Sequence, residues 1–229
     1  PYVLMNYQDN LNSVFTLAHE MGHALHSYYS DHNQPYVYAG YRIFVAEVAS
    51  TCNEVLLMRH LLGKTEDKKE RAYLINHFLE QFRTTLYRQT MFAEFELKMS
   101  ELTANGESVN AETATKVYHD LIDLYFGPDI VHDEYIDLEW ARIPHFYYNF
   151  YVYQYATGFS AAIALSQKIL SEGESAVKAY KEKFLSAGCS KDPVSILKDA
   201  GVDMSTKKPV EQALALFNSL LDEMDELMK

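Results

Sequence analysis

Residues 10–30 read Asn10-Leu-Asn-Ser-Val-Phe-Thr-Leu-Ala-His-Glu-Met-Gly-His-Ala-Leu-His-Ser-Tyr-Tyr-Ser30. Apolar residues recur in this stretch at steps of three and four, which is the spacing of one face of an α-helix. Residues four apart lie on the same helix face, so His19 and His23 can turn their imidazoles toward one metal ion. Glu20 is next to the first histidine and can reach a metal-bound water without ligating the metal. The stretch therefore predicts a helix that carries two metal ligands and a general base.

A catalytic zinc ion takes three protein ligands and keeps one position open for water, so the two histidines need a third partner. In the metzincin class a glycine and then a third histidine follow the second one, but here His26 and Tyr29 occupy these positions. The candidate that remains is Glu47, which lies 28 residues after His19 among small and apolar neighbours. A carboxylate in such a setting is costly unless a cation compensates its charge. The alternative is a surface glutamate on an amphipathic helix.

Two further residues are expected near the metal. Glu54 lies two helical turns after Glu47 on the same face, where it could accept the free N–H of a ligand histidine. A solvent-exposed glutamate is the alternative. His26 shares a face with His19 and His23. We expect His26 to shape the pocket without ligating the ion, because three ligands and one water already fill the coordination sphere of zinc.

A second segment carries side chains that could take part in catalysis. It reads His145-Phe-Tyr-Tyr-Asn-Phe-Tyr-Val-Tyr-Gln-Tyr155 and has five tyrosines and one histidine in eleven residues. Tyr148, Tyr151 and Tyr155 are spaced by three and four, so on a helix they would share one face. Peptide hydrolysis passes through a tetrahedral oxyanion, which phenol or imidazole donors can stabilise. The alternative is an aromatic core stripe whose hydroxyls reach the surface.

Helical patterns cover most of the remaining chain. They are expected at about 41–62, 65–102, 111–126, 156–170, 173–187, 193–200 and 209–228, and Gly63 is expected to end the first of them. Residues 1–7 have the short, apolar and aromatic character of a strand, and residues 128–144 have that of an acidic loop. No linker rich in Gly, Ser or Pro interrupts the chain. The pattern predicts a mainly α fold in one domain, residues 1–229, with a short strand at its N-terminal end.

Composition excludes several classes of protein. The 229 residues include 20 Lys and Arg against 32 Asp and Glu, and a net charge of −12 argues against a nucleic-acid partner. No apolar run approaches the ~20 residues that a membrane span needs, so no membrane partner is expected. Cys52 and Cys189 are expected to be free thiols in a reducing compartment, which favours a cytoplasmic location. The first residue is Pro1 rather than Met, so we expect a further segment upstream.

Three blocks together resemble one family. They are the segment from His19 to His26, the segment Phe44-Val-Ala-Glu-Val-Ala-Ser-Thr-Cys-Asn-Glu54, and the tyrosine-rich run from His145 to Gly158. In order and spacing they are similar to the catalytic C-terminal part of the oligoendopeptidase F group, in the thimet-oligopeptidase-like M3 family of zinc metallopeptidases. The His-Glu-x-x-His core is weak evidence alone, whereas the three blocks together are specific.

The resemblance implies a mostly helical, zincin-like catalytic domain beside a deep channel that admits short peptides. It implies one Zn²⁺ per chain, held by His19, His23 and Glu47, with Glu20 as the general base. It also implies that His145 and tyrosines of the later block contact the substrate or the oxyanion; Tyr151 and Tyr155 are the best matches and Tyr148 is a weaker one. Family members are longer than this chain, so an N-terminal portion of the same enzyme is expected to form much of the opposite channel wall.

The expected activity is zinc-dependent cleavage of internal bonds in short unstructured oligopeptides. Two alternatives stay open. The chain could be a zinc-binding fragment that is inactive without its N-terminal half, or an exopeptidase with the same ligands. An exopeptidase would need a site that grips a free terminus, and no clear signature of one is present in the sequence.

Overall fold

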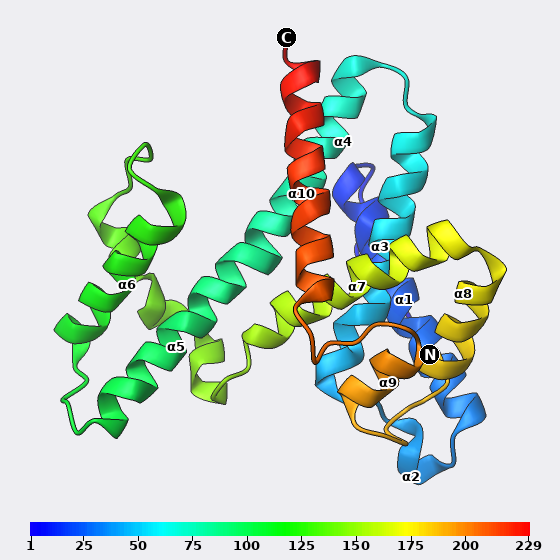
Figure 1. Ribbon diagram of the computed structural model, residues 1–229, viewed down its shortest axis with the longest axis horizontal. Helices are drawn as coiled ribbons and strands as arrows, with labels where there is room; N and C mark the ends of the chain where they lie inside the picture. Colours follow the sequence, from blue (N-terminus) through cyan, green and yellow to red (C-terminus); the bar gives the residue numbers. More distant parts are fainter. The chain divides into compact units, whose positions relative to one another are not determined.

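The regular parts of the chain are helical (Figure 1). The computed structural model describes residues 1–229, apart from the side chain of one residue, Glu134. Its α-helices are α1 (Leu11–Asn33), α2 (Tyr36–Ala39), α3 (Ile43–Lys64), α4 (Lys68–Gln81), α5 (Arg88–Ala104), α6 (Ala111–Phe126), α7 (Tyr153–Glu172), α8 (Glu174–Ala179), α9 (Pro193–Asp199) and α10 (Lys208–Leu227). Two π-helical segments, η1 (Phe82–Tyr87) and η4 (Tyr180–Leu185), and two 3₁₀ segments, η2 (Glu134–Arg142) and η3 (Pro144–Tyr148), complete the order. The mainly α fold class is confirmed.

Two compact units make up the chain. The first unit contains residues 1–82 and 157–229, and the second unit contains residues 83–156. The core of the first unit includes Val48, Ala49, Leu165, Phe184 and Leu197. The core of the second includes Phe92, Phe95, Tyr118, Leu121 and Ile122. Each unit therefore has a core of its own, and the single-domain organisation stays a prediction.

The first unit is built around a close approach of α1 to α3. Helix α1 begins after Asn10, whose side chain accepts a hydrogen bond from the backbone N–H of Ser13, as an N-cap does. At Gly22, in the middle of α1, a Cβ atom would lie 2.5 Å from the Cα of Ser50 and 2.7 Å from the carbonyl oxygen of Ala49. The two helices can approach this closely because residue 22 has no side chain.

The observed elements differ from the predicted ones in several places. Gly63 lies inside α3, because a glycine ends a helix when it turns left-handed and Gly63 does not. The helix predicted over 65–102 is divided by the π-helical segment η1. The acidic loop over 128–144 contains the 3₁₀ segment η2, which Asp133 caps by accepting from the N–H of Tyr135. The predicted N-terminal strand is wrong: residues 1–8 form no regular structure, and no other described residue forms a strand that could pair with them.

A buried carboxylate links three elements of the second unit. Glu139, in η2, is 5% exposed. It accepts a hydrogen bond of 2.7 Å from the hydroxyl of Tyr118 on α6, and it pairs with Arg88 on α5 and with Arg142. Two guanidinium groups and a phenol compensate the buried charge, which would otherwise be expensive.

Two findings concern the chain as a whole. None of the helices in the described part of the chain is both long enough and apolar enough to cross a membrane. Cys52 and Cys189 are both free; Cys52 is buried in the core of the first unit.

Candidate metal centre

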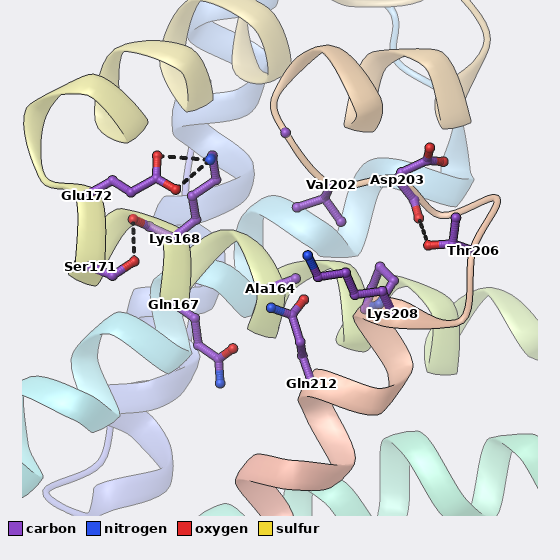
Figure 2. Close-up of a pocket in the computed structure, with 12 residues that line it drawn as sticks. Ala164, Gln167, Lys168, Ser171, Glu172, Val202, Asp203, Thr206, Lys208 and Gln212 are labelled. Carbon is purple, nitrogen blue, oxygen red and sulfur yellow. Dashed lines mark hydrogen bonds and ion pairs between the residues drawn. The ribbon is translucent and has the colours of Figure 1, made fainter.

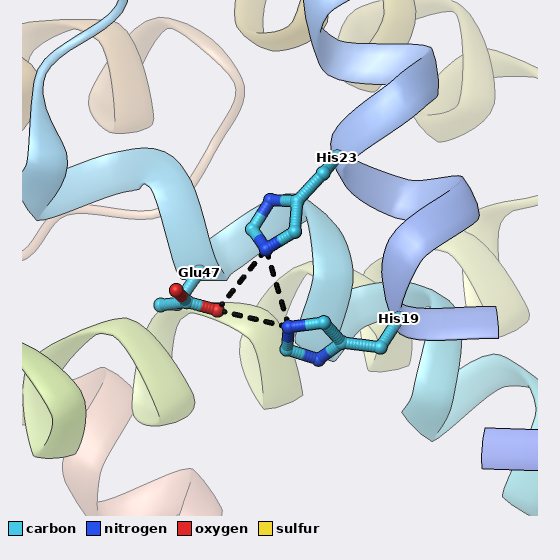
Figure 3. A group of neighbouring side chains, drawn as sticks. All are labelled: His19, His23 and Glu47. Carbon is cyan, nitrogen blue, oxygen red and sulfur yellow. Dashed lines mark hydrogen bonds and ion pairs between the residues drawn. The ribbon is translucent and has the colours of Figure 1, made fainter. Parts of the chain in front are cut away.

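Three predicted ligands lie together in the first unit (Figure 3). The Nε2 atoms of His19 and His23 are 3.2 Å apart, and both face the same carboxylate oxygen of Glu47. Oε2 of Glu47 is 3.3 Å from Nε2 of His19 and 3.5 Å from Nε2 of His23. The helical spacing of four brings the two histidines to one face of α1, and the packing of α3 supplies the glutamate.

This triangle fits a zinc ion. A tetrahedral ion with ligands at about 2.0–2.1 Å keeps its ligand atoms about 3.3 Å apart. The three observed edges, 3.2, 3.3 and 3.5 Å, match that separation. Two imidazole nitrogens and one carboxylate oxygen are also a donor set that catalytic zinc uses, with a position left for water.

Electrostatics make the triangle a site for positive charge. Burial lowers the pKa of His19, but the hydrogen-bonded carboxylates of Glu47 and Glu54 outweigh it and raise the pKa to about 10. Hydrogen bonds from His19 and His23 hold the pKa of Glu47 well below its ordinary value. A proton and a metal ion therefore compete for the same histidine nitrogen, and metal binding releases the proton.

A second layer of hydrogen bonds orients the triangle. Oε1 of Glu54 lies 2.6 Å from Nδ1 of His19, which is the contact expected of a residue that orients a ligand histidine. The amide nitrogen of Gln81, on α4, donates to the other oxygen of Glu54 at 2.7 Å. The hydroxyl of Ser50 donates to Oε2 of Glu47 at 3.0 Å.

Sequence reasoning missed two of these supporting residues. Ser50 follows Glu47 by three positions, so their contact could have been read from helical spacing. Gln81 comes from another helix, and no local pattern links it to Glu54. The mid-helix Gly22 was a readable signal, because a glycine inside a helical pattern often marks close packing.

Glu20 and His26 lie beside the triangle. Glu20 lines an open hollow of about 420 Å³ together with His19 and Glu54. The role of Glu20 as general base stays a prediction. His26 is buried and is not part of the triangle; its ring stacks on Tyr41 with ring centres 3.7 Å apart. Its position agrees with a residue that shapes the site without ligating the ion.

The aromatic candidates form a group in the second unit. The ring of His145 stacks on Tyr151 at 5.6 Å and meets Tyr155 edge-on at 6.0 Å. Tyr151 contacts Tyr155 at 5.6 Å and Tyr148 at 6.1 Å. The structure thus brings all four residues together.

The spacing predicted that these residues share one helix, and this prediction is wrong. His145 and Tyr148 lie in η3, and α7 begins only at Tyr153. Between them the backbone turns at Asn149 and Phe150, which both have positive φ angles, of 31° and 55°. The N–H of Phe150 donates to Oε1 of the buried Glu96 at 2.9 Å, which helps to hold this strained turn. The roles of His145 and the tyrosines in catalysis stay predictions.

Another polar pocket of the first unit carries no comparable chemistry (Figure 2). It lies between α7 and the start of α10, with a volume of about 430 Å³. In its wall Lys168 pairs with Glu172 at 2.7 Å, and Asp203 pairs with Lys198 at 2.8 Å. Neither of the two metal-ligand clusters found among the described residues lies in this pocket.

Comparison with known proteins agrees with the site. The chain is 56% identical over 228 residues to oligopeptidase PepF of Bacillus subtilis (strain 168), a match that covers 100% of this chain and 34% of that protein. It is 45% identical over 228 residues to the chromosomal oligoendopeptidase F of Lactococcus lactis subsp. cremoris, covering 100% of this chain and 38% of the other. The chain therefore spans little more than a third of the length of these relatives.

A solved structure gives the same result. The crystal structure of oligoendopeptidase-F from Enterococcus faecium matches with a TM-score of 0.85 and 44% identity, over 95% of this chain and 39% of that one. Residues 1–216 match the family described as peptidase family M3. The helical fold, the His-Glu-x-x-His helix with Glu47 beside it, and a family match over nearly the whole chain lead to one conclusion: this chain belongs to peptidase family M3.

Proposed function

We propose that this chain is the catalytic part of a zinc-dependent endopeptidase that hydrolyses internal bonds of short unstructured oligopeptides. The observation that carries the proposal is the triangle of His19, His23 and Glu47, whose edges suit a tetrahedral ion. The relatives named oligopeptidase and oligoendopeptidase support the substrate class. The two unpaired cysteines favour a cytoplasmic location.

The residues have separate tasks in this proposal. His19, His23 and Glu47 hold the ion, and Glu54 keeps the ring of His19 in its orientation. When bound, zinc supplies a water of lowered pKa and polarises the carbonyl to be cleaved. Glu20 takes a proton from the attacking water and passes it to the leaving amine, so that the peptide bond is replaced by a carboxylate and an amine. His145, Tyr151, Tyr155 and the more exposed Tyr148 donate to the substrate or the oxyanion.

The decisive experiment uses a peptide of about ten residues that is blocked at both ends, a length chosen for an oligopeptide. The peptide is incubated with the chain, with and without a chelator, and the products are identified by mass spectrometry. We expect internal cleavage that the chelator abolishes and that added zinc restores. Cleavage that persists in chelator would contradict a metallopeptidase, and a requirement for a free terminus would indicate an exopeptidase.

Glu47→Ala tests the ligand set directly. Loss of one of three protein ligands should abolish stable zinc binding at the triangle, measured as the loss of one equivalent of metal after dialysis. Glu66→Ala is the matched control, because it makes the same substitution at an exposed glutamate outside the site, and it should retain the metal. Unchanged metal content in Glu47→Ala would remove Glu47 from the ligand set.

A second reading is that the chain binds zinc but does not turn over alone. It is favoured by one observation, that the chain spans only 34% and 38% of two relatives. In that case the wild-type chain holds zinc and leaves the peptide uncut, and cleavage appears when the remaining N-terminal portion is supplied. The metal assay and the cleavage assay together separate the two readings.

A further inference from the structure

A second group of metal-ligand side chains lies in the second unit, outside the M3 site. His119 is on α6, His132 is in the loop that follows it, and Asp137 is in η2. One ligand atom from each of the three lies within 4.8 Å of the others. Gly127 ends α6 with a φ of 75°, a conformation that favours glycine, and the chain turns there before it returns to His132.

The contacts within this group are those of a compact histidine–carboxylate cluster. Nδ1 of His119 lies 3.0 Å from Oδ2 of Asp137. Asp123, one turn after His119 on α6, meets both histidines: its carboxylate oxygens lie 3.4 Å from Nε2 of His119 and 3.3 Å from Nε2 of His132. The two imidazole rings meet edge-on with centres 5.8 Å apart. The 3.0 Å between Nδ1 of His119 and Oδ2 of Asp137 is close to the edge of about 3.3 Å between ligands of a small tetrahedral ion, and the contacts of Asp123 leave Nδ1 of each histidine to face the ion.

Two atoms of the group lack a partner within the described residues. Nδ1 of His132 and Oδ1 of Asp137 are buried from solvent and form no hydrogen bond. Buried polar atoms are nearly always satisfied, so each unsatisfied one requires an explanation. If the cluster were only a network of ion pairs, burying these two atoms without a hydrogen bond would destabilise the fold, and nothing in the cluster would compensate the loss. A bound cation would accept the free electron pairs of these nitrogen and oxygen atoms and so give them a partner.

We propose that His119, His132 and Asp137 bind a divalent transition-metal ion, with zinc as the chemically best match, and that Asp123 orients the two histidines. Imidazole nitrogens with a carboxylate favour zinc and its neighbours in the first transition series over magnesium or calcium, which prefer oxygen ligands alone. The site is structural: its ligands come from α6, the loop after it and η2, so a bound ion fastens the 127–137 segment to α6. It is independent of the proposed peptidase activity.

The test is zinc stoichiometry, measured on the full chain after equilibration with a buffer that sets free zinc in the micromolar range. We expect the wild type to hold a second equivalent of zinc beyond the one bound by the triangle of His19, His23 and Glu47. His119→Ala and His132→Gln should each lose that second equivalent and keep the first. His23→Ala should lose the first and keep the second. Asp123→Asn, which leaves the three ligands in place, should weaken the second site by about 10–100-fold.

His60→Ala is the matched control, because His60 is an exposed histidine outside both clusters, and it should keep both ions. Circular dichroism checks that each variant retains its helices, and His132→Gln serves if His119→Ala does not fold. As a second readout, zinc should slow amide hydrogen exchange over residues 127–137 in the wild type but not in His132→Gln. One zinc per chain in the wild type, or a second zinc that survives both histidine substitutions, would overturn the proposal.

Discussion

His19 is contacted on both sides of its ring. Glu47 faces Nε2 at 3.3 Å and Glu54 faces Nδ1 at 2.6 Å. With Nδ1–H donated to Glu54, Nε2 keeps its lone pair for a metal ion when the ring is neutral. The pair of carboxylates thus does two things at this residue: it fixes the ring in place and it favours a cation at Nε2.

Glu20→Gln separates metal binding from catalysis. The substitution keeps the size of the side chain but removes the group that accepts a proton. Zinc content should stay unchanged, whereas turnover should fall by about 10²–10⁴-fold, the usual contribution of a general base. Asp31→Asn, at an exposed acid on the same helix, is the control and should retain activity. Full activity in Glu20→Gln would exclude Glu20 as the base.

His26 should make stability fall in acid. Burial, followed by the charge of His23, lowers its pKa from 6.5 to about 3. Below pH 6.5 the unfolded chain binds a proton at His26 that the folded chain does not bind. Above pH 6.5 the contribution of neutral His26 to the free energy of unfolding is complete. As the pH falls from 6.5 toward 3, the free energy of unfolding decreases by up to about 1.4 kcal/mol per pH unit.

Urea unfolding at pH 7 and pH 5.5 measures this effect, with chelator present so that metal release does not contribute. His26→Phe removes the titrating group and keeps an aromatic ring beside Tyr41. The wild type should lose about 1 kcal/mol more stability between the two pH values than the variant does. Equal losses would show that His26 does not titrate as its burial predicts.

At the level of elements, the crossing of α1 and α3 depends on one missing side chain. In Gly22→Ala the new methyl group would meet the backbone of Ala49 and Ser50, and backbone cannot rotate away as a side chain can. We expect a loss of about 1–3 kcal/mol in stability, typical of overpacking. Zinc affinity should fall at least about tenfold, because Glu47 moves away from the histidines with α3.

Gly63→Ala is the matched control for this prediction. Gly63 lies inside α3, and a Cβ there would meet nothing within 4 Å. Alanine should stabilise the helix by up to about 1 kcal/mol and leave zinc binding unchanged. Denaturant unfolding and a zinc titration of both variants give the comparison. Normal zinc affinity in Gly22→Ala would show that the site tolerates a wider helix crossing.

For the whole molecule, the two units raise the question of cooperativity. Glu139 is buried in the second unit with Arg88, Arg142 and Tyr118 as partners. Glu139→Ala leaves their charges and hydroxyl without an acceptor, which should cost about 3–5 kcal/mol. Because each unit has its own core, amide hydrogen exchange should speed up in α6 but not in α1 or α3. Equal acceleration in all three helices would instead support the single domain predicted from the sequence.

The predictions that came from the sequence are those in which neighbours along the chain decide the outcome. The periodicity of residues 10–30 predicted α1, and the spacing of four predicted that His19 and His23 would face one point, as they do. The packing of α3 against α1 brings Glu47 to both histidines, but the sequence singled it out by its local neighbours alone, because a carboxylate among apolar residues requires a cation. Helix geometry makes such relations local, so a single sequence contains them.

Other features were decided only by the tertiary structure. Gln81 lies behind Glu54 because α4 packs beside α3, and the aromatic group of His145 and Tyr151 is formed by a left-handed turn rather than by a continuous helix. His132 and Asp137 come to His119 through a loop whose path no periodicity describes. In each case the contact joins segments whose separation depends on how backbones pack against one another. Local residue spacing can mark a close approach, as Gly22 does, but it does not say which distant segments meet, so only the folded chain determines these contacts.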